Sequence, residues 1–317
     1  MKKASILLLT GLWLVQCTSP VPDSPSTVEQ FISPDLNQEP TFLNLKEGIS
    51  VPTWDLKFSA GNQGYLVDLN EQAGTVVCPA DSGVDFATAA FPGTISFQTD
   101  TMDQLAIGER WLLPTSYNPM DHSIQGRGQV YFLRCADYRR LKLEVLRATP
   151  TEFQFRWAEE QEDHTFLPEQ AETVSCTADA PARWSPSLGS ALSDVDWHLG
   201  LVSKPITVPN VGTFYMPSVQ INTETVSRYA LWEGGDLEGD LPAASTFTWQ
   251  DFRGETQPLG YGGSQALLVY HPEPPYNHKV IVEHPEQILV LDLNPDLLLV
   301  QFLDYDSGVA VIQLRRP

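Results

Sequence analysis

The sequence predicts an all-β protein made of two tandem copies of one antiparallel, sandwich-like domain. Three observations lead to this prediction. Short apolar or alternating runs rich in Val, Leu, Phe and Tyr recur along the chain and are separated by turn residues, as in antiparallel sheets. Amphipathic helical periodicity is scarce. The second half also repeats the first at offsets of 143 to 152 residues.

The internal repeat consists of short matches that occur in the same order in both halves. The matched pairs are Trp54 with Trp197, Leu56 with Leu199, Val67 with Val219, Asn70 with Asn222, Val130 with Val280, and Phe153 with Val300. A period of about 150 residues is a whole domain, because solenoid units have only about 20 to 50 residues. We therefore expect a first domain over residues 41–171 and a second over residues 172–317.

Each predicted strand is a short run bounded by turn signals. The runs cover residues 64–70, 129–134, 141–146, 152–157, 279–283, 288–293 and 297–303. The last of them continues through a turn of Asp, Ser and Gly into residues 309–314, which predicts a closing hairpin. Residues 101–111 are the best candidate for a helix.

The first 17 residues have the layout of a bacterial lipoprotein signal. Two lysines precede an apolar run from Ile6 to Val15, which is too short to span a membrane. The following Leu-Val-Gln-Cys resembles a lipobox, in which the signal is cut before the cysteine and the cysteine is acylated; Gln16 departs from the small residue usual there. We expect export, lipidation of Cys17 and anchoring at the outer membrane or cell surface. The alternative is an ordinary signal peptide cut nearby.

Composition limits the partners and the redox chemistry. Residues 18–40 contain five prolines and four serines and are predicted to be an extended linker. With 40 acidic and 19 basic residues the formal charge is −21, which repels phosphate backbones, so no nucleic-acid partner is expected. Cys78, Cys135 and Cys176 are odd in number, which allows one disulfide, in three possible pairings, and one free thiol.

Several short segments of the chain resemble one known family. These are Phe-Leu-Asn-Leu-Lys-Glu-Gly at 42–48, Trp-Asp-Leu-Lys-Phe at 54–58, the strand end Asp-Leu-Asn at 68–70, and Val-Gln-Phe-Leu-Asp-Tyr at 300–305. They are similar to the HmuY-like haem-binding lipoproteins of Bacteroidetes. The resemblance implies an all-β sandwich-like fold and a lipoprotein that takes up haem outside the cell and passes it to an outer-membrane receptor.

The resemblance also implies that His or Met side chains, from the loops before the strands at 130 and 280, hold the haem iron. His122 precedes the first of these strands by eight residues and His271 precedes the second by nine, so we expect them at a shared position. Met120 is a second possible donor in the same loop, and Met102 a candidate for the opposite face. In the second copy His278 is the only other donor nearby. The alternative is that all of them are ordinary loop or core residues.

Other functions have weaker support in the sequence. We expect no enzyme, because no G-x-S-x-G, H-E-x-x-H or phosphate-binding loop occurs. We expect the ligand to be haem, as the resemblance implies, or another small molecule. One alternative is a carbohydrate-binding surface lipoprotein, for which five tryptophans could supply stacking rings: Trp111, Trp157, Trp184, Trp232 and Trp249. The other is a scaffold that binds proteins and no cofactor.

Overall fold

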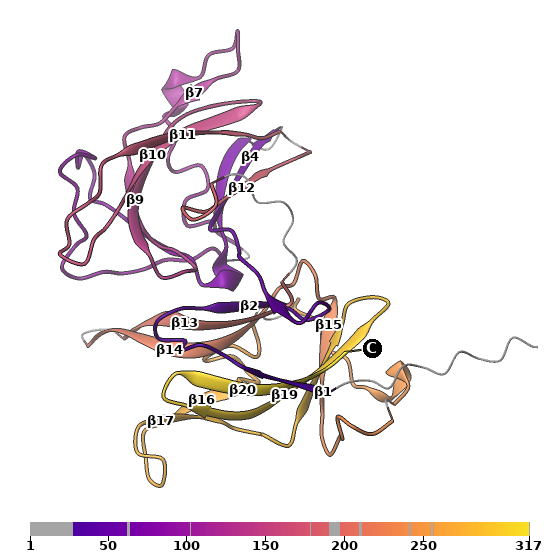
Figure 1. The fold of residues 1–317 in the computed structure, drawn as a ribbon. Helices are drawn as coiled ribbons and strands as arrows, with labels where there is room; N and C mark the ends of the chain where they lie inside the picture. Colours follow the sequence, from indigo (N-terminus) through magenta and orange to yellow (C-terminus); the bar gives the residue numbers. More distant parts are fainter. Residues whose placement is uncertain are drawn as a thin grey trace, which may run out of the picture.

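The computed structural model describes residues 28–61, 64–101, 103–177, 179–189, 197–208, 211–240, 242–253, 255 and 257–316. They form two β bodies, one above the other in Figure 1. We call residues 51–189 domain 1, and residues 28–50 together with 197–316 domain 2. The predicted all-β class is confirmed, since the helices described are three short 3-10 turns, η1 (Glu71–Ala73), η2 (Pro114–Ser116) and η3 (Ala244–Thr246). No described helix has the length and apolar character needed to cross a membrane.

Domain 1 consists of two antiparallel sheets. The larger has the order β11-β10-β9-β8-β6, with β7 also paired to β9, and the smaller has the order β12-β4-β5. Their inward side chains form one core. The strands are β4 (Leu56–Gly61), β5 (Gly64–Leu69), β6 (Val76–Pro79), β7 (Ile124–Gln125), β8 (Val130–Arg134), β9 (Arg140–Thr149), β10 (Glu152–Glu159), β11 (Gln170–Ser175) and β12 (Ala182–Trp184).

Domain 2 has two corresponding sheets and a separate two-stranded hairpin. The sheet orders are β1-β20-β19-β18-β15 and β14-β13-β2-β3, and β16 pairs with β17. The strands are β1 (Val28–Ile32), β2 (Thr41–Asn44), β3 (Ile49–Ser50), β13 (Leu199–Val208), β14 (Gly212–Ile221), β15 (Arg228–Trp232), β16 (Leu268–His271), β17 (Lys279–Val282), β18 (Ile288–Asp292), β19 (Leu297–Asp306) and β20 (Val309–Arg315).

The same arrangement of strands occurs in both domains. The sheet β11-β10-β9-β8-β6 corresponds, strand for strand, to β1-β20-β19-β18-β15, and β12-β4-β5 corresponds to β2-β13-β14. A bulge recurs at the same place, where Leu146 of β9 and Leu303 of β19 are skipped in the pairing with the next strand. Register and bulge together establish an internal duplication.

One hydrogen bond reproduces the first sequence match in both domains. The Asn70 side-chain amide donates to the Trp54 carbonyl, and the Asn222 amide donates to the Trp197 carbonyl, each at 2.9 Å. Each asparagine directly follows the second strand of its hairpin, β5 or β14. It ties the end of that hairpin back to the residue before its first strand.

The later sequence matches are wrong in register. Val130 begins β8, whose counterpart is β18, whereas Val280 lies in β17. Phe153 lies in β10, whose counterpart is β20, whereas Val300 lies in β19. Alternating apolar strands resemble their neighbours closely, so a shift by one whole strand leaves the pattern of residue types almost unchanged.

The predicted strands are confirmed, but the helix predicted over 101–111 is wrong. The described residues of this segment form bends and isolated bridges, such as Gly108 with Val67. The Asp100 carboxylate accepts hydrogen bonds from the Ala106 N–H at 2.6 Å and the Leu69 N–H at 2.7 Å. It thereby satisfies the Ala106 N–H, a backbone donor that a helix would otherwise use, and fixes the segment to the end of β5.

The N-terminal segment completes domain 2 instead of linking it to a membrane. From residue 28 onward the predicted 18–40 linker is wrong, because β1 pairs with β20 along its full length. β2 pairs with β13, so the predicted boundaries 41–171 and 172–317 are wrong as well. The indigo N-terminal strands lie among the yellow C-terminal ones in Figure 1. Domain 1 is therefore inserted between two parts of domain 2.

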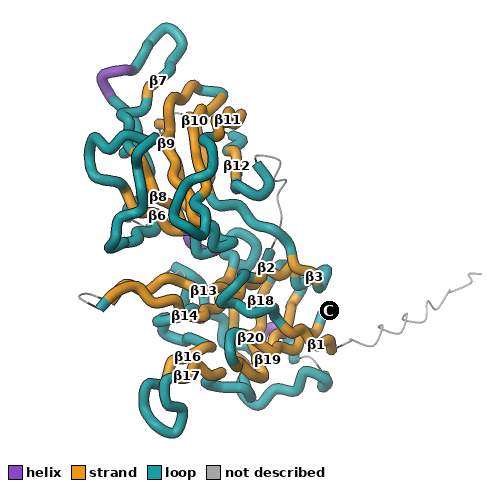
Figure 2. The backbone as a smooth tube through the Cα atoms, turned by 60° about the vertical axis from the view of Figure 1, so that its left-hand side comes forward, coloured by secondary structure: helices purple, strands orange, loops and turns teal. Residues whose placement is uncertain are grey.

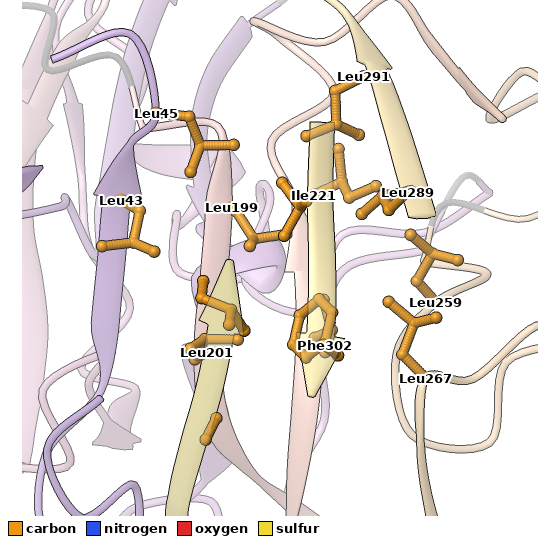
Figure 3. Close-up of a cluster of buried hydrophobic side chains, with 14 of the residues drawn as sticks. Leu43, Leu45, Leu199, Leu201, Ile221, Leu259, Leu267, Leu289, Leu291 and Phe302 are labelled. Atoms are coloured by element: carbon orange, nitrogen blue, oxygen red, sulfur yellow. The ribbon is translucent and has the colours of Figure 1, made fainter. Parts of the chain in front are cut away.

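The core of domain 2 contains side chains from both ends of the chain. Leu36, Leu43 and Leu45 are at most 1% exposed and pack in one cluster with residues from β13 to β20. Figure 3 shows Leu43 on the N-terminal strand β2 and Leu45 directly after it, beside Leu199 and close to the C-terminal strands. Each buried leucine contributes roughly 1.5 to 3 kcal/mol of hydrophobic stabilisation.

The two domains meet through equivalent turns. Gln72 follows β5 and Thr223 follows β14, and their side chains are joined by a hydrogen bond of 2.7 Å. The Thr223 N–H also donates to the Gln72 side-chain oxygen at 3.0 Å. A small apolar cluster with members from both domains lies beside them, including Ala73, Trp197 and Val202. The view turned by 60° in Figure 2 again shows the two bodies stacked end to end.

Replacing Leu43 by alanine should destabilise domain 2 by about 2 to 5 kcal/mol, because a fully buried leucine leaves a cavity when truncated. Hydrogen exchange of the β20 amides should accelerate more than that of the β9 amides. The control is Lys46→Ala, which removes an exposed ion pair with Asp296 and should cost less than about 1 kcal/mol. Equal acceleration in β9 and β20 would contradict the closure of domain 2 by the N-terminal strands.

Candidate functional site

A hairpin arm of domain 1 carries the first candidate residues. Leu112 and Gly126 form a bridge at its base, and Asn118 and Ser123 form one at its tip. The outgoing side contains the 3-10 turn η2 and the return side contains β7. The arm projects beyond β9 and β10 at the top of Figure 1.

His122 lies at the tip of this arm, directly before the return strand. Its backbone has a φ of 54°, in the left-handed region, and its side chain is exposed. The Nδ1 atom lies 2.5 Å from the Tyr117 hydroxyl. The Tyr65 hydroxyl, from β5, donates to the His122 carbonyl and holds the tip against the sheet. No hydrogen bond to Nε2 occurs among the described residues.

Three apolar or aromatic side chains of the arm are exposed, and one of them, Tyr117, contacts His122. Met120 is 89% exposed, Tyr117 is 47% exposed and Leu113 is 41% exposed. Such a group of exposed apolar side chains on one projecting element is unusual for a free surface and typical of a contact site.

The β16–β17 hairpin of domain 2 is the counterpart of this arm. In domain 1 the Arg127 N–H donates to the Trp111 carbonyl at 2.8 Å, and in domain 2 the Glu283 N–H donates to the Leu267 carbonyl at 3.2 Å. Both residues of the second pair lie 156 positions after those of the first. The return strands are therefore aligned by a shift of 156 residues.

This shift matches His122 with His278. His278 also directly precedes its return strand, also has a positive φ, of 65°, and is also exposed. Its Nδ1 atom lies 2.6 Å from the Tyr270 hydroxyl. The two domains thus present the same pair, an exposed histidine bonded at Nδ1 to a tyrosine, at the same place on equivalent hairpins.

The predicted shared position of His122 and His271 is wrong. His271 lies in β16, opposite Lys279, and not at the hairpin tip. Its Nε2 atom lies 2.8 Å from the Glu283 carboxylate, so the outer nitrogen is already used. The sequence comparison chose His271 because it matched the wrong strand, and a comparison by strand pairing would have found His278.

Two candidate residues lie outside the described part of the chain, namely Met102 and Cys17. Among the residues that are described, no cluster of three or more His, Cys, Asp or Glu side chains could hold a metal ion.

The three cysteines and three of the candidate tryptophans are buried inside the protein. Cys78, Cys135 and Cys176 are buried free thiols, so no disulfide joins them. Burial raises the pKa of all three, to about 11 for Cys176, which makes them poor nucleophiles. Among the tryptophans considered for sugar stacking, three are at most 4% exposed and belong to the core of domain 1: Trp111, Trp157 and Trp184.

Sequence reasoning missed a pair of buried polar residues at equivalent places. The Asn70 N–H donates to the Asp55 carbonyl at 2.9 Å, and the Asn222 N–H donates to the His198 carbonyl at 3.2 Å. Both side chains are at most 3% exposed. His198 Nδ1 accepts a hydrogen bond from the Leu45 N–H at 3.0 Å. One copy thus has a carboxylic acid where the other has an imidazole.

Asp55 is held at the junction of β4 and the turn after β8. Its Oδ1 atom accepts hydrogen bonds from the Ala136 N–H at 2.6 Å and the Thr75 hydroxyl at 2.8 Å. Burial, reinforced by the nearby Asp137, raises the pKa of Asp55 to about 7, although the two hydrogen bonds act in the opposite direction.

Comparison with protein-family models, with curated proteins and with solved structures finds no match to this chain.

The elevated pKa of Asp55 should make the protein less stable as pH rises. The folded state holds this proton more tightly than the unfolded chain, so the contribution is full below the ordinary pKa of 3.8 and is lost as pH rises through about 7. The shift corresponds to about 4 kcal/mol. Asp55→Asn still supplies an oxygen as hydrogen-bond acceptor but cannot titrate. It should remove this pH dependence of the free energy of unfolding in urea, while the exposed control Asp81→Asn should keep the pH dependence. Equal pH dependence in all three proteins would contradict the assignment.

Proposed function

We propose that this protein captures haem at the cell surface through the histidines at its two hairpin tips. The observation that carries the proposal is the repeated pair of His122 with Tyr117 and His278 with Tyr270. Haem is the cargo, and it supplies the iron that the side chains described here would ligate.

The tyrosine contact prepares the histidine for ligation. A neutral imidazole binds iron through one nitrogen, while the other carries a proton and usually donates it to a fixed acceptor. If Nδ1 of His122 donates to the Tyr117 hydroxyl oxygen, the lone pair lies on Nε2. That atom has no partner among the described residues, so the ring is oriented and its outer nitrogen is available.

The apolar rim of the domain 1 arm suits a flat porphyrin. Tyr117 offers an exposed ring beside His122, Leu113 adds exposed apolar area on the same arm, and the Met120 thioether is a second possible donor of the type that binds haem iron. In domain 2, Tyr276 is 41% exposed near the His278 tip. His271, with its Nε2 atom bonded to Glu283, is the weaker candidate on that hairpin.

The two tips would act separately. β7 lies at the top and β16 and β17 at the bottom of the molecule, both in Figure 1 and in the view turned by 60° in Figure 2. One haem cannot reach both histidines across the length of two domains. The proposal therefore implies two sites, each with one histidine from this chain.

Export and a lipid anchor at Cys17 complete the proposal. The sequence before residue 28 has the layout of a lipoprotein signal and a short polar connection, which would hold domain 2 close to the membrane. Captured haem would then pass to an outer-membrane receptor.

The mature N-terminus should begin at an acylated Cys17. Mass spectrometry of the protein purified from membranes should detect the acyl mass on this residue, and Cys17→Ser should release the protein from the membrane fraction. An unmodified Cys17 in the mature chain would contradict the anchor.

Titration with haem should produce a Soret shift with two equivalents bound per chain. His122→Ala and His278→Ala should each remove one equivalent, and the double variant should remove both. His164→Ala is the matched control, because His164 is also an exposed histidine with a positive φ and lies on a turn far from both hairpins in sequence. It should leave the titration unchanged.

The tyrosines provide a finer test. Tyr117→Phe keeps the ring and removes the partner of Nδ1 in His122. It should weaken haem binding at that tip by about tenfold or more, in the range that loss of such supporting contacts has at metal sites. No Soret shift with the unaltered protein, or a shift that survives loss of both histidines, would refute haem capture at the tips.

A further inference from the structure

Domain 2 contains a cavity of about 690 Å³ next to its hairpin. It lies between the end of β15, the segment 261–270 and the segment 283–287. Its volume is within the range of small-molecule sites, about 300 to 1,000 Å³. Leu231, Leu267 and Leu268 provide an apolar part of the wall.

The lining differs from the equivalent place in domain 1. Leu267 corresponds to Trp111, because both carbonyls accept the hydrogen bond that closes the base of the hairpin. Trp111 is 1% exposed, packs on Phe153 and donates its ring N–H to the Tyr65 carbonyl at 3.1 Å. The smaller leucine of domain 2 has neither the ring nor the N–H.

Two glutamine amides in the wall are oriented by a buried tyrosine. The Tyr229 hydroxyl lies 2.9 Å from the Gln250 side-chain oxygen and 2.8 Å from that of Gln265. A phenol has one proton, so the Tyr229 hydroxyl can donate to only one of the two amide oxygens. The other amide fits best with its nitrogen turned toward the hydroxyl, so that it donates to the hydroxyl oxygen. One amide N–H₂ and one amide oxygen then remain for a ligand, which suits a hydroxyl group that donates and accepts.

The charges at the cavity exclude anions. Glu233 contributes one carboxylate and Glu283, which is bonded to His271, contributes another, and no lysine or arginine occurs among the described residues that line it. Phosphates and carboxylates, including the propionates of haem, would be repelled. A sugar hydroxyl instead donates to a carboxylate and gains a charge-assisted hydrogen bond.

Aromatic rings and further neutral polar groups complete the wall. Tyr261 and Tyr270 are half-buried and both line the cavity, together with Ser264 and Gln287. A tyrosine face packs against the apolar C–H face of a sugar ring. Tyr261 can offer its hydroxyl as well as its ring, whereas the Tyr270 hydroxyl is bonded to His278 and Tyr270 would contribute its ring alone. Mixed apolar faces and neutral donors and acceptors are what a polyhydroxylated ring requires.

We infer that this cavity of domain 2 binds a neutral saccharide, separately from haem at the hairpin tips. The inference stands on the cavity alone and does not depend on haem capture. Glu233 and Gln287 would accept and donate hydrogen bonds to ring hydroxyls, and Tyr261 would pack on the ring.

Isothermal titration with maltotriose, cellotriose, mannotriose and chitotriose tests this inference. At least one of these neutral sugars should bind to the intact chain. Glu233→Ala and Gln287→Ala should each weaken that binding about tenfold or more, a loss of about 1.4 kcal/mol. Both side chains are at least partly exposed, so the fold should tolerate these changes.

Asp81→Ala is the matched control. In domain 1 Val77 forms a bridge with Gln98, and in domain 2 Tyr229 forms the equivalent bridge with Gln250. Asp81 lies four residues after Val77 as Glu233 lies four residues after Tyr229, so the two acidic residues occupy equivalent places. This variant should bind sugar normally, and all three variants should give an unchanged Soret titration with haem. The inference would be overturned if none of the four sugars bound, or if spermidine bound in their place. It would also be overturned if a sugar bound equally well to both cavity variants. A Soret response that changes with Glu233→Ala would assign the cavity to haem instead.

Discussion

The closure of domain 2 by the N-terminal strands is the constraint on which the rest of the structure depends. β1 covers the edge of β20 and β2 covers the edge of β13. Without them β20 and β13 would be the unpaired edge strands of their sheets, and the core would lack Leu36, Leu43 and Leu45. Domain 1 lies between the two parts of domain 2 in the sequence. Both chain segments that join the domains therefore leave from strands that are paired within domain 2. The turn around Gln72 is thereby held against the equivalent turn around Thr223.

Local patterns allowed the strands to be predicted, but not their partners. The alternation in residues 297–303 and 309–314 defines two strands and their turn, and both were found almost within their predicted bounds. Pairing between distant strands depends on loop lengths and on edges that need cover, which no window of sequence contains. Residues 28–32 lie between prolines and have few apolar neighbours in sequence, so their pairing with β20 was invisible. The same limitation produced the match of His122 with His271.

The two copies have kept their backbone and changed their interiors. Asp55 is replaced by His198 at the same junction, and Trp111 by Leu267 at the base of the hairpin. Each change alters which polar groups must be satisfied and how much space is filled. A duplicated fold tolerates such changes because strand pairing, the shared bulge and the Asn–Trp bond fix the chain path independently. The cavity in domain 2 is lined in part by Leu267, which stands where domain 1 has the packed ring of Trp111.

At the hairpin tips, in contrast, both copies have the same arrangement of a histidine bonded to a tyrosine. A contribution to stability does not explain this similarity. An exposed hydrogen bond between a tyrosine and a histidine adds little to the free energy of folding, roughly 1 kcal/mol at most. The two tyrosines also reach the histidine from different positions, five residues before His122 and eight residues before His278. A contact inherited only with the backbone would come from the same position in both copies. The same histidine geometry reached by two routes, at the most projecting part of each domain, indicates a requirement on the histidine itself. The ligation through Nε2 that we propose would be such a requirement, because it needs the ring held at Nδ1 and nothing more from the fold.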